Sequence, residues 1–199
     1  YYFDGFLLAE DFWVDVPALD WEIQGETPDY WFHWFTDYTG GNYPEMIFYS
    51  NPDEPFTGEA RVVSPVLNSQ DFTALTLKFR HAQFWSSGSY IFKVQTSNNG
   101  GTTWNDVWST NVTGSMQGQS ELVVIDNSDV GSDTFQFSFV FEGNSSNLEF
   151  LAIDEVRLYQ AAEIDMVTTD LIIPEIIEPE DVVSPVGHIE NWGFLTTEF

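Results

Sequence analysis

The stretch Thr134–Phe141 has a phenylalanine at every second position, with Thr, Gln, Ser and Val at the others, and this pattern limits the possible folds more than any other. Successive side chains of an extended chain point to opposite faces, so its phenylalanines share one face. The same alternation occurs in Leu75–Ala82 and Tyr90–Thr96, whereas no stretch sustains a helical period. Many short strands of this kind predict an all-β chain folded as a two-sheet antiparallel β-sandwich.

Residues Leu148–Tyr159 predict the strand that closes this sandwich, because their apolar members are largely β-branched or aromatic. Two acidic residues, Asp154 and Glu155, interrupt the strand. A carboxylate in a buried strand is costly unless a cation or hydrogen-bond donors satisfy it. We therefore expect Asp154 to help hold a metal ion; the simpler alternative is a carboxylate at the surface.

The charge balance restricts the kinds of partner that the chain can bind. The sequence has 32 acidic residues against five lysines and arginines, which gives a formal net charge of −27. Such a surface repels nucleic acid and anionic lipid, and it attracts divalent cations. The sequence has no cysteine and no apolar run of about 18 residues, the length of a membrane span. It starts at Tyr1, as it would after removal of a signal peptide or in a partial chain.

Several motifs occur in an order that resembles the MAM-like jelly-roll modules of bacterial surface proteins, which include the cleaved-adhesin and choice-of-anchor groups. The resemblance covers residues 8–159. It rests on Glu10-Asp11-Phe12, Trp21 and residues 58–65 (GEARVVSP), 77–81 (LKFRH), 94–104 (VQTSNNGGTTW), 141–143 (FEG) and 151–156 (LAIDEV). It implies a concanavalin-like jelly roll over residues 1–160, with structural calcium, in a secreted multidomain protein.

The resemblance also implies which residues hold the calcium ion. In modules of this kind an early acidic residue meets the acidic residue of the closing strand at the metal; here these would be Glu10 and Asp154. Glu155 stands where the family often has a second aspartate, so its part stays open. Calcium binds roughly six to eight oxygens. From their place in the chain, Asn51 and Asp53 are expected to complete the shell.

The character of the chain changes after Gln160, where we place a boundary between residues 1–160 and 161–199. The second segment has strand-like stretches at Val167–Ile173 and Val186–Glu190, separated by prolines. It resembles the opening strands of immunoglobulin-like adhesin modules. It is too short for an independent sandwich. It is therefore either a partial immunoglobulin-like segment or a tail that donates a strand to another subunit, as in a strand-exchanging filament.

The sequence contains no nucleophile elbow, phosphate-binding loop or ordered Ser/His/Asp set, so no enzyme activity is expected. Trp31, Trp34 and Trp85 are candidate sugar-stacking platforms, although aromatic side chains on strands more often pack in a core. The sequence thus predicts a non-catalytic, calcium-stabilised, extracellular adhesion or assembly module that contacts other protein subunits. The alternative is a carbohydrate-binding module of a secreted hydrolase.

Overall fold

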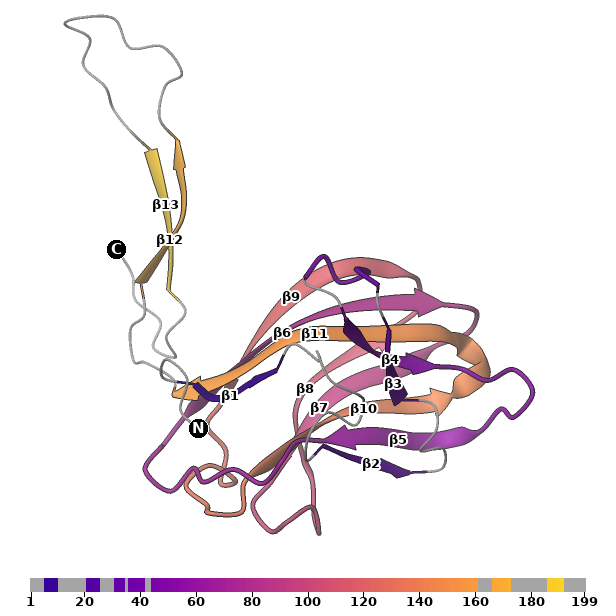
Figure 1. Ribbon diagram of the computed structural model, residues 1–199, viewed down its shortest axis with the longest axis horizontal. Coiled ribbons are helices and arrows are strands. Elements are labelled where there is room, and N and C mark those ends of the chain that lie inside the picture. The colour runs from indigo at the N-terminus through magenta and orange to yellow at the C-terminus, as the bar shows by residue number, and fades with distance from the viewer. Residues whose placement is uncertain are drawn as a thin grey trace, which may run out of the picture. The chain divides into compact units, whose positions relative to one another are not determined.

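The computed structural model describes residues 6–10, 21–25, 31–34, 36–41, 44–160, 166–172 and 186–191 (Figure 1). Residue contacts divide the chain into two compact units, Tyr1–Gln160 and Ala161–Phe199. The described part of the first unit consists of strands arranged as two facing sheets, together with loops and one 3-10 turn, η2 (Ser145–Asn147). The predicted all-β, two-sheet jelly roll is confirmed.

Sheet A contains six strands, and all its pairings are antiparallel. They are β1 (Phe6–Glu10), β3 (Trp31–Trp34), β4 (Glu45–Tyr49), β6 (Leu75–Trp85), β9 (Met116–Ile125) and β11 (Leu148–Gln160). The order is β3-β4-β11-β6-β9, and β1 pairs with the C-terminal part of β11. The predicted closing strand β11 is therefore central in its sheet, between β4 and β6.

Sheet B contains five strands in the order β2-β5-β10-β7-β8, again antiparallel throughout. They are β2 (Glu22–Gly25), β5 (Thr57–Val63), β7 (Tyr90–Ser97), β8 (Asn105–Val112) and β10 (Gln136–Asn144). The phenylalanine-rich stretch becomes β10, the middle strand. Its inward phenylalanines pack against sheet A, as a strand between two sheets requires.

The core between the sheets is mainly aromatic. Phe139 of β10 is fully buried, and its ring centroid lies 5.0 Å from that of Phe79 on sheet A and 6.2 Å from that of Phe92 on sheet B. Phe135 precedes β10 and joins the core through an isolated bridge to Leu67. Edge-to-face and stacked pairs of this kind stabilise a core beyond their buried area.

The second unit contains β12 (Met166–Ile172) and β13 (Val186–Asn191), which pair antiparallel with each other. Both strands lie where the sequence predicts strand-like stretches. The immunoglobulin-like character of this segment stays a prediction. Within the described ranges, no helix is long and apolar enough to cross a membrane.

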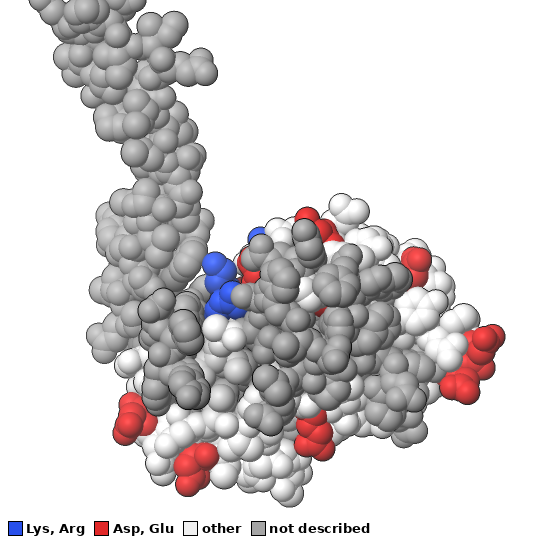
Figure 2. All heavy atoms as spheres, viewed as in Figure 1, with Lys and Arg blue, Asp and Glu red and all other residues white. Residues whose placement is uncertain are grey.

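Acidic side chains spread over the visible face of the first unit rather than forming one patch, whereas the few visible basic ones lie close together (Figure 2). In a sheet with one buried face and one solvent-exposed face, charged side chains lie on the exposed face. This surface agrees with the strongly negative composition.

Candidate functional site

Strand β11 contains a β-bulge, where its pairing with β6 shifts register between Asp154 and Arg157. Glu155 lies in this bulge with a φ of 49°, a left-handed conformation that residues other than glycine rarely adopt. Asp154 immediately precedes it and has none of its surface exposed. Because bulges redirect a strand, this one sets the direction of the chain beside a buried carboxylate.

The loop that precedes β4 packs directly onto this carboxylate. A Cβ atom added to Gly41 would lie 2.3 Å from Asp154 Oδ2 and 3.3 Å from Glu155 Cγ. Real Cβ atoms essentially never approach another atom within 3.0 Å, so a larger residue would displace one of these groups. Glycine at position 41 therefore allows the loop backbone to reach Asp154.

Glu45, the first residue of β4, is a second fully buried carboxylate on this side of the sheet. It accepts hydrogen bonds from the Thr36 hydroxyl at 2.9 Å, the Tyr38 amide at 3.0 Å and the Thr39 amide at 2.6 Å. These bonds hold the loop on the sheet. Sequence reasoning missed Glu45; the available signal was a carboxylate at the head of an otherwise apolar strand.

Arg80 of β6 holds the same loop from the other side. Its Nε and Nη2 donate to the Thr39 carbonyl at 2.9 and 2.7 Å. The Tyr38 ring lies 5.0 Å from that of Phe84 and 4.6 Å from that of Phe150. The loop is therefore fixed by charged hydrogen bonds at one end and aromatic contacts at the other, across the face of sheet A that points away from the core.

The other predicted calcium ligands lie on β1 and in a turn: Glu10 is in β1, and Asn51 and Asp53 follow β4. Glu10 pairs in register with Val156, two residues beyond Asp154. Asn51 and Asp53 form a turn, in which the Asp53 amide donates to Asn51 Oδ1 at 3.0 Å. That turn follows the other end of β4, where Tyr49 pairs with Phe150.

The structure does not bring Asn51 and Asp53 together with Asp154. Ile153, next to Asp154, pairs with Met46, whereas the turn begins beyond Ser50. Four residues of extended chain span about 13 Å, too far for one coordination shell. Within the described ranges, no three His, Asp or Glu side chains gather closely enough to hold a metal ion. The calcium ion and its ligation by Glu10 and Asp154 stay predictions.

The histidines lie on separate strands, His33 on β3, His81 on β6 and His188 on β13. His81 is buried in the core, with Nε2 3.2 Å from Glu121 Oε1 and Nδ1 3.1 Å from the Gln83 amide nitrogen. Burial lowers the pKa of His81, and Glu121 partly opposes this shift. These contacts give His81 a packing role.

The three tryptophans that the sequence proposes for sugar stacking belong to one sheet but not to one platform. Trp31 and Trp34 lie on β3, whereas Trp85 ends β6, with β4 and β11 between these strands. Neighbouring strands are about 4.8 Å apart, so about 14 Å separates β3 from β6. The indole N–H of Trp85 donates to the Gly88 carbonyl at 2.9 Å. A single sugar ring cannot contact all three.

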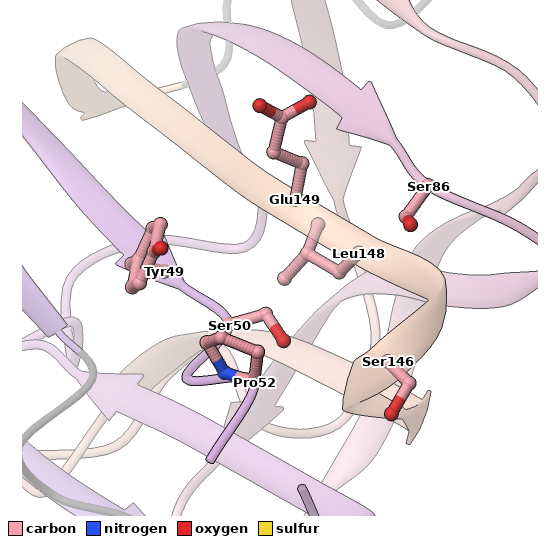
Figure 3. Close-up of a pocket in the computed structure, with 7 residues that line it drawn as sticks. All are labelled: Tyr49, Ser50, Pro52, Ser86, Ser146, Leu148 and Glu149. Carbon is pink, nitrogen blue, oxygen red and sulfur yellow. The ribbon is translucent and has the colours of Figure 1, made fainter. Parts of the chain in front are cut away.

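A groove of about 280 Å³ lies instead at the end of the sandwich where β4, β6 and η2 meet (Figure 3). Its lining residues are Tyr49, Ser50, Pro52, Ser86, Ser146, Leu148 and Glu149. Tyr49 has 39% of its surface exposed and stands across the groove from the Ser86 and Ser146 hydroxyls. An exposed ring, hydroxyl groups and a carboxylate suit a polar ligand with an apolar face.

Neither a protein-family model nor a curated protein sequence matches this chain. Solved structures share its fold. The K1 cleaved adhesin domain of Lys-gingipain from Porphyromonas gingivalis superposes with a TM-score of 0.59 at 18% identity, covering 78% of this chain and 98% of that domain. The chain has the fold of a cleaved adhesin domain. The K3 domain of the same protein gives 0.57 at 18% identity, covering 79% of this chain and 99% of that domain.

A carbohydrate-binding protein shares the fold as well. The CBM22-1–GH10 modules of Clostridium thermocellum xylanase 10B, complexed with xylohexaose, give a TM-score of 0.52 at 12% identity. The match covers 80% of this chain and 29% of that protein. At these identities the likeness concerns the fold alone. It confirms the predicted cleaved-adhesin type of jelly roll, whereas the MAM-like and choice-of-anchor relations stay predictions.

Proposed function

We propose that this chain is a non-catalytic, extracellular adhesion module that binds a saccharide in the groove beside Tyr49. The main support for this proposal is the exposed Tyr49 ring, which lies opposite the Ser86 and Ser146 hydroxyls in a space of about 280 Å³. A sugar ring presents one apolar face for stacking and hydroxyls around its edge, which these groups match. The volume is near the lower end of small-ligand pockets, which favours one or two sugar units.

The groove is better suited to binding than to hydrolysis. Glycosidases place two carboxylates on either side of the scissile bond, about 5–9.5 Å apart. Glu149 is the single carboxylate among the described residues that line this groove. A module with this groove would retain its saccharide, either for adhesion or as an appended carbohydrate-binding module of a secreted hydrolase.

The groove is tested by binding the full chain to a glycan array, followed by calorimetry with the best neutral glycan and with xylohexaose. Tyr49→Ala should weaken the best glycan at least tenfold, equivalent to about 1.4 kcal/mol, because the stacking ring is lost. Tyr49→Phe, the matched control, should bind like the parent protein. Equal affinity of the alanine variant, with an unchanged melting curve, would remove Tyr49 from the proposal.

The proposal includes a structural calcium ion at Asp154, with Glu10 as its second carboxylate. The buried position of Asp154, the approach of the Gly41 backbone and the neighbouring place of Glu10 on β1 support it. Carboxylate and carbonyl oxygens are the ligands that calcium prefers.

The C-terminal unit is proposed to contact other subunits by strand addition. Its described strands, β12 and β13, pair with each other, and a two-stranded ribbon is only marginally stable alone. Pairing with a further strand from another copy would add backbone hydrogen bonds. Light scattering should therefore show assembly of the full chain that a chain ending at Gln160 lacks. Unchanged assembly of the shorter chain would contradict this role.

A further inference from the structure

Three polar side chains occupy adjoining ladder positions on the outer face of sheet B. Ser138 on the middle strand β10 pairs with Gln95 on β7 and with Val63 on β5. Arg61 lies two residues from Val63 and pairs with Val140. The phenylalanines on either side of Ser138 point into the core, so Ser138 and its ladder neighbours point away from it.

Each of these side chains keeps a buried polar atom without a hydrogen-bond partner: Ser138 Oγ, Gln95 Oε1 and Arg61 Nη1. Ser138 is fully buried and Gln95 is 6% exposed. The other ends of the long side chains are fixed, because Gln95 Nε2 donates to Asp106 at 2.7 Å and Arg61 Nη2 donates to Glu59. Buried polar groups are normally paired, so three together imply a missing partner.

An aromatic ring lies beside one member of this group. Trp104, from the β7–β8 turn, has the Arg61 guanidinium carbon 5.1 Å from its ring centroid. A Cβ added to Gly101 would come within 3.1 Å of the Trp104 ring and 3.7 Å of Gln136 Oε1, which places the ring beside β10. Trp104 is half-buried, so part of this residue is open to solvent.

The charges nearby define the ligand class. Lys93 is 6% exposed and donates to Glu59 at 2.8 Å and Glu142 at 2.6 Å, with Asp106 3.8 Å away. These carboxylates disfavour an anion, and Lys93 with Arg61 disfavours a cation. The three orphan atoms are a donor, an acceptor and a hydroxyl that does both. Sugar hydroxyls also both donate and accept.

We propose that the outer face of sheet B is a second saccharide site, which binds a neutral sugar through Ser138, Gln95 and Arg61 and against Trp104. It lies on the opposite sheet from the Tyr49 groove and on separate residues. It does not depend on the groove. The competing explanation is that ordered water alone fills the space and satisfies the three atoms.

The test uses the full chain on an array of neutral and acidic glycans, with Ser138→Ala, Gln95→Met and Tyr49→Ala variants. Some neutral glycans should stay bound to Tyr49→Ala and bind Ser138→Ala at least tenfold more weakly. Ser138→Ala should melt at the same temperature or higher, because it removes an unpaired buried hydroxyl. Gln95→Met keeps the side-chain length and should weaken the same glycans.

Three results would overturn this site. They are the loss of all glycan binding in Tyr49→Ala alone, an unchanged affinity and melting temperature of Ser138→Ala, and an unchanged affinity of Ser138→Ala with a lower melting temperature. The last result would identify water as the partner. Weaker binding of some glycans in Tyr49→Ala supports the groove, whereas retention of every glycan in Tyr49→Ala refutes the groove, so the two proposals fail separately. A parent protein that binds no glycan refutes both.

Discussion

Removal of calcium with excess EGTA is expected to lower the melting temperature by about 10 °C. A ligand that binds only the folded state stabilises it by about 4 kcal/mol at a thousandfold excess over its dissociation constant. For a domain of this size each kcal/mol corresponds to about 2–4 °C. The stabilisation would come from the charge of Asp154, which is buried against the Gly41 backbone. Differential scanning fluorimetry with and without EGTA, followed by calcium addition, measures the shift.

Two variants assign this shift to the bulge of β11. Asp154→Asn keeps the shape of the side chain, removes its charge and should melt at the same temperature in calcium and in EGTA. Asp53→Asn, in the turn at the other end of β4, should keep the full calcium response. Identical melting curves of the parent protein in both buffers would exclude structural calcium, and a calcium response in Asp154→Asn would place the ion elsewhere.

Glu45→Ala is expected to lower the free energy of unfolding by about 3 kcal/mol, because it leaves hydrogen-bond donors of Thr36, Tyr38 and Thr39 without their acceptor. The loss should also loosen the contact of Tyr38 with Phe84. Chemical denaturation, followed by tryptophan fluorescence, gives the free energy directly.

The controls for Glu45 separate charge from hydrogen bonding. Glu45→Gln keeps one amide oxygen as an acceptor, so its loss should be about half that of the alanine variant. Glu149→Ala, at an exposed position of the neighbouring strand, should change stability by less than about 0.5 kcal/mol. If Glu45→Ala is as stable as Glu149→Ala, the loop does not depend on this carboxylate.

Local patterns predicted the strands whose side chains alternate and left out β8, at one edge of sheet B. Thr134–Phe141 became the middle strand β10 because its phenylalanines face a core. The edge strand β8 (Asn105–Val112) has mainly exposed or half-buried polar residues, so no alternating apolar signal marked it. A strand with one buried face alternates apolar and polar residues, and this alternation can be recognised in the sequence. The edge strand β8 largely lacks that burial.

The candidate sites depend on pairing register, which a single sequence does not reveal. Asp154 was identifiable because a carboxylate in an apolar strand needs compensation. Its supposed partners Asn51 and Asp53 were chosen from chain order, and the length of β4 separates them from it. Arg61, Gln95 and Ser138 are far apart in the chain and meet only because β5, β10 and β7 are neighbours.

The position of the basic residues has a consequence for proteolysis. All five lie within strands, Arg61 in β5, Lys78 and Arg80 in β6, Lys93 in β7 and Arg157 in β11, and each is buried or half-buried. A protease needs a locally opened, accessible segment, and paired strands open rarely. Enzymes that cut after lysine or arginine would therefore find no bond in a loop or in residues 161–199. The folded module should survive where such enzymes degrade its neighbours.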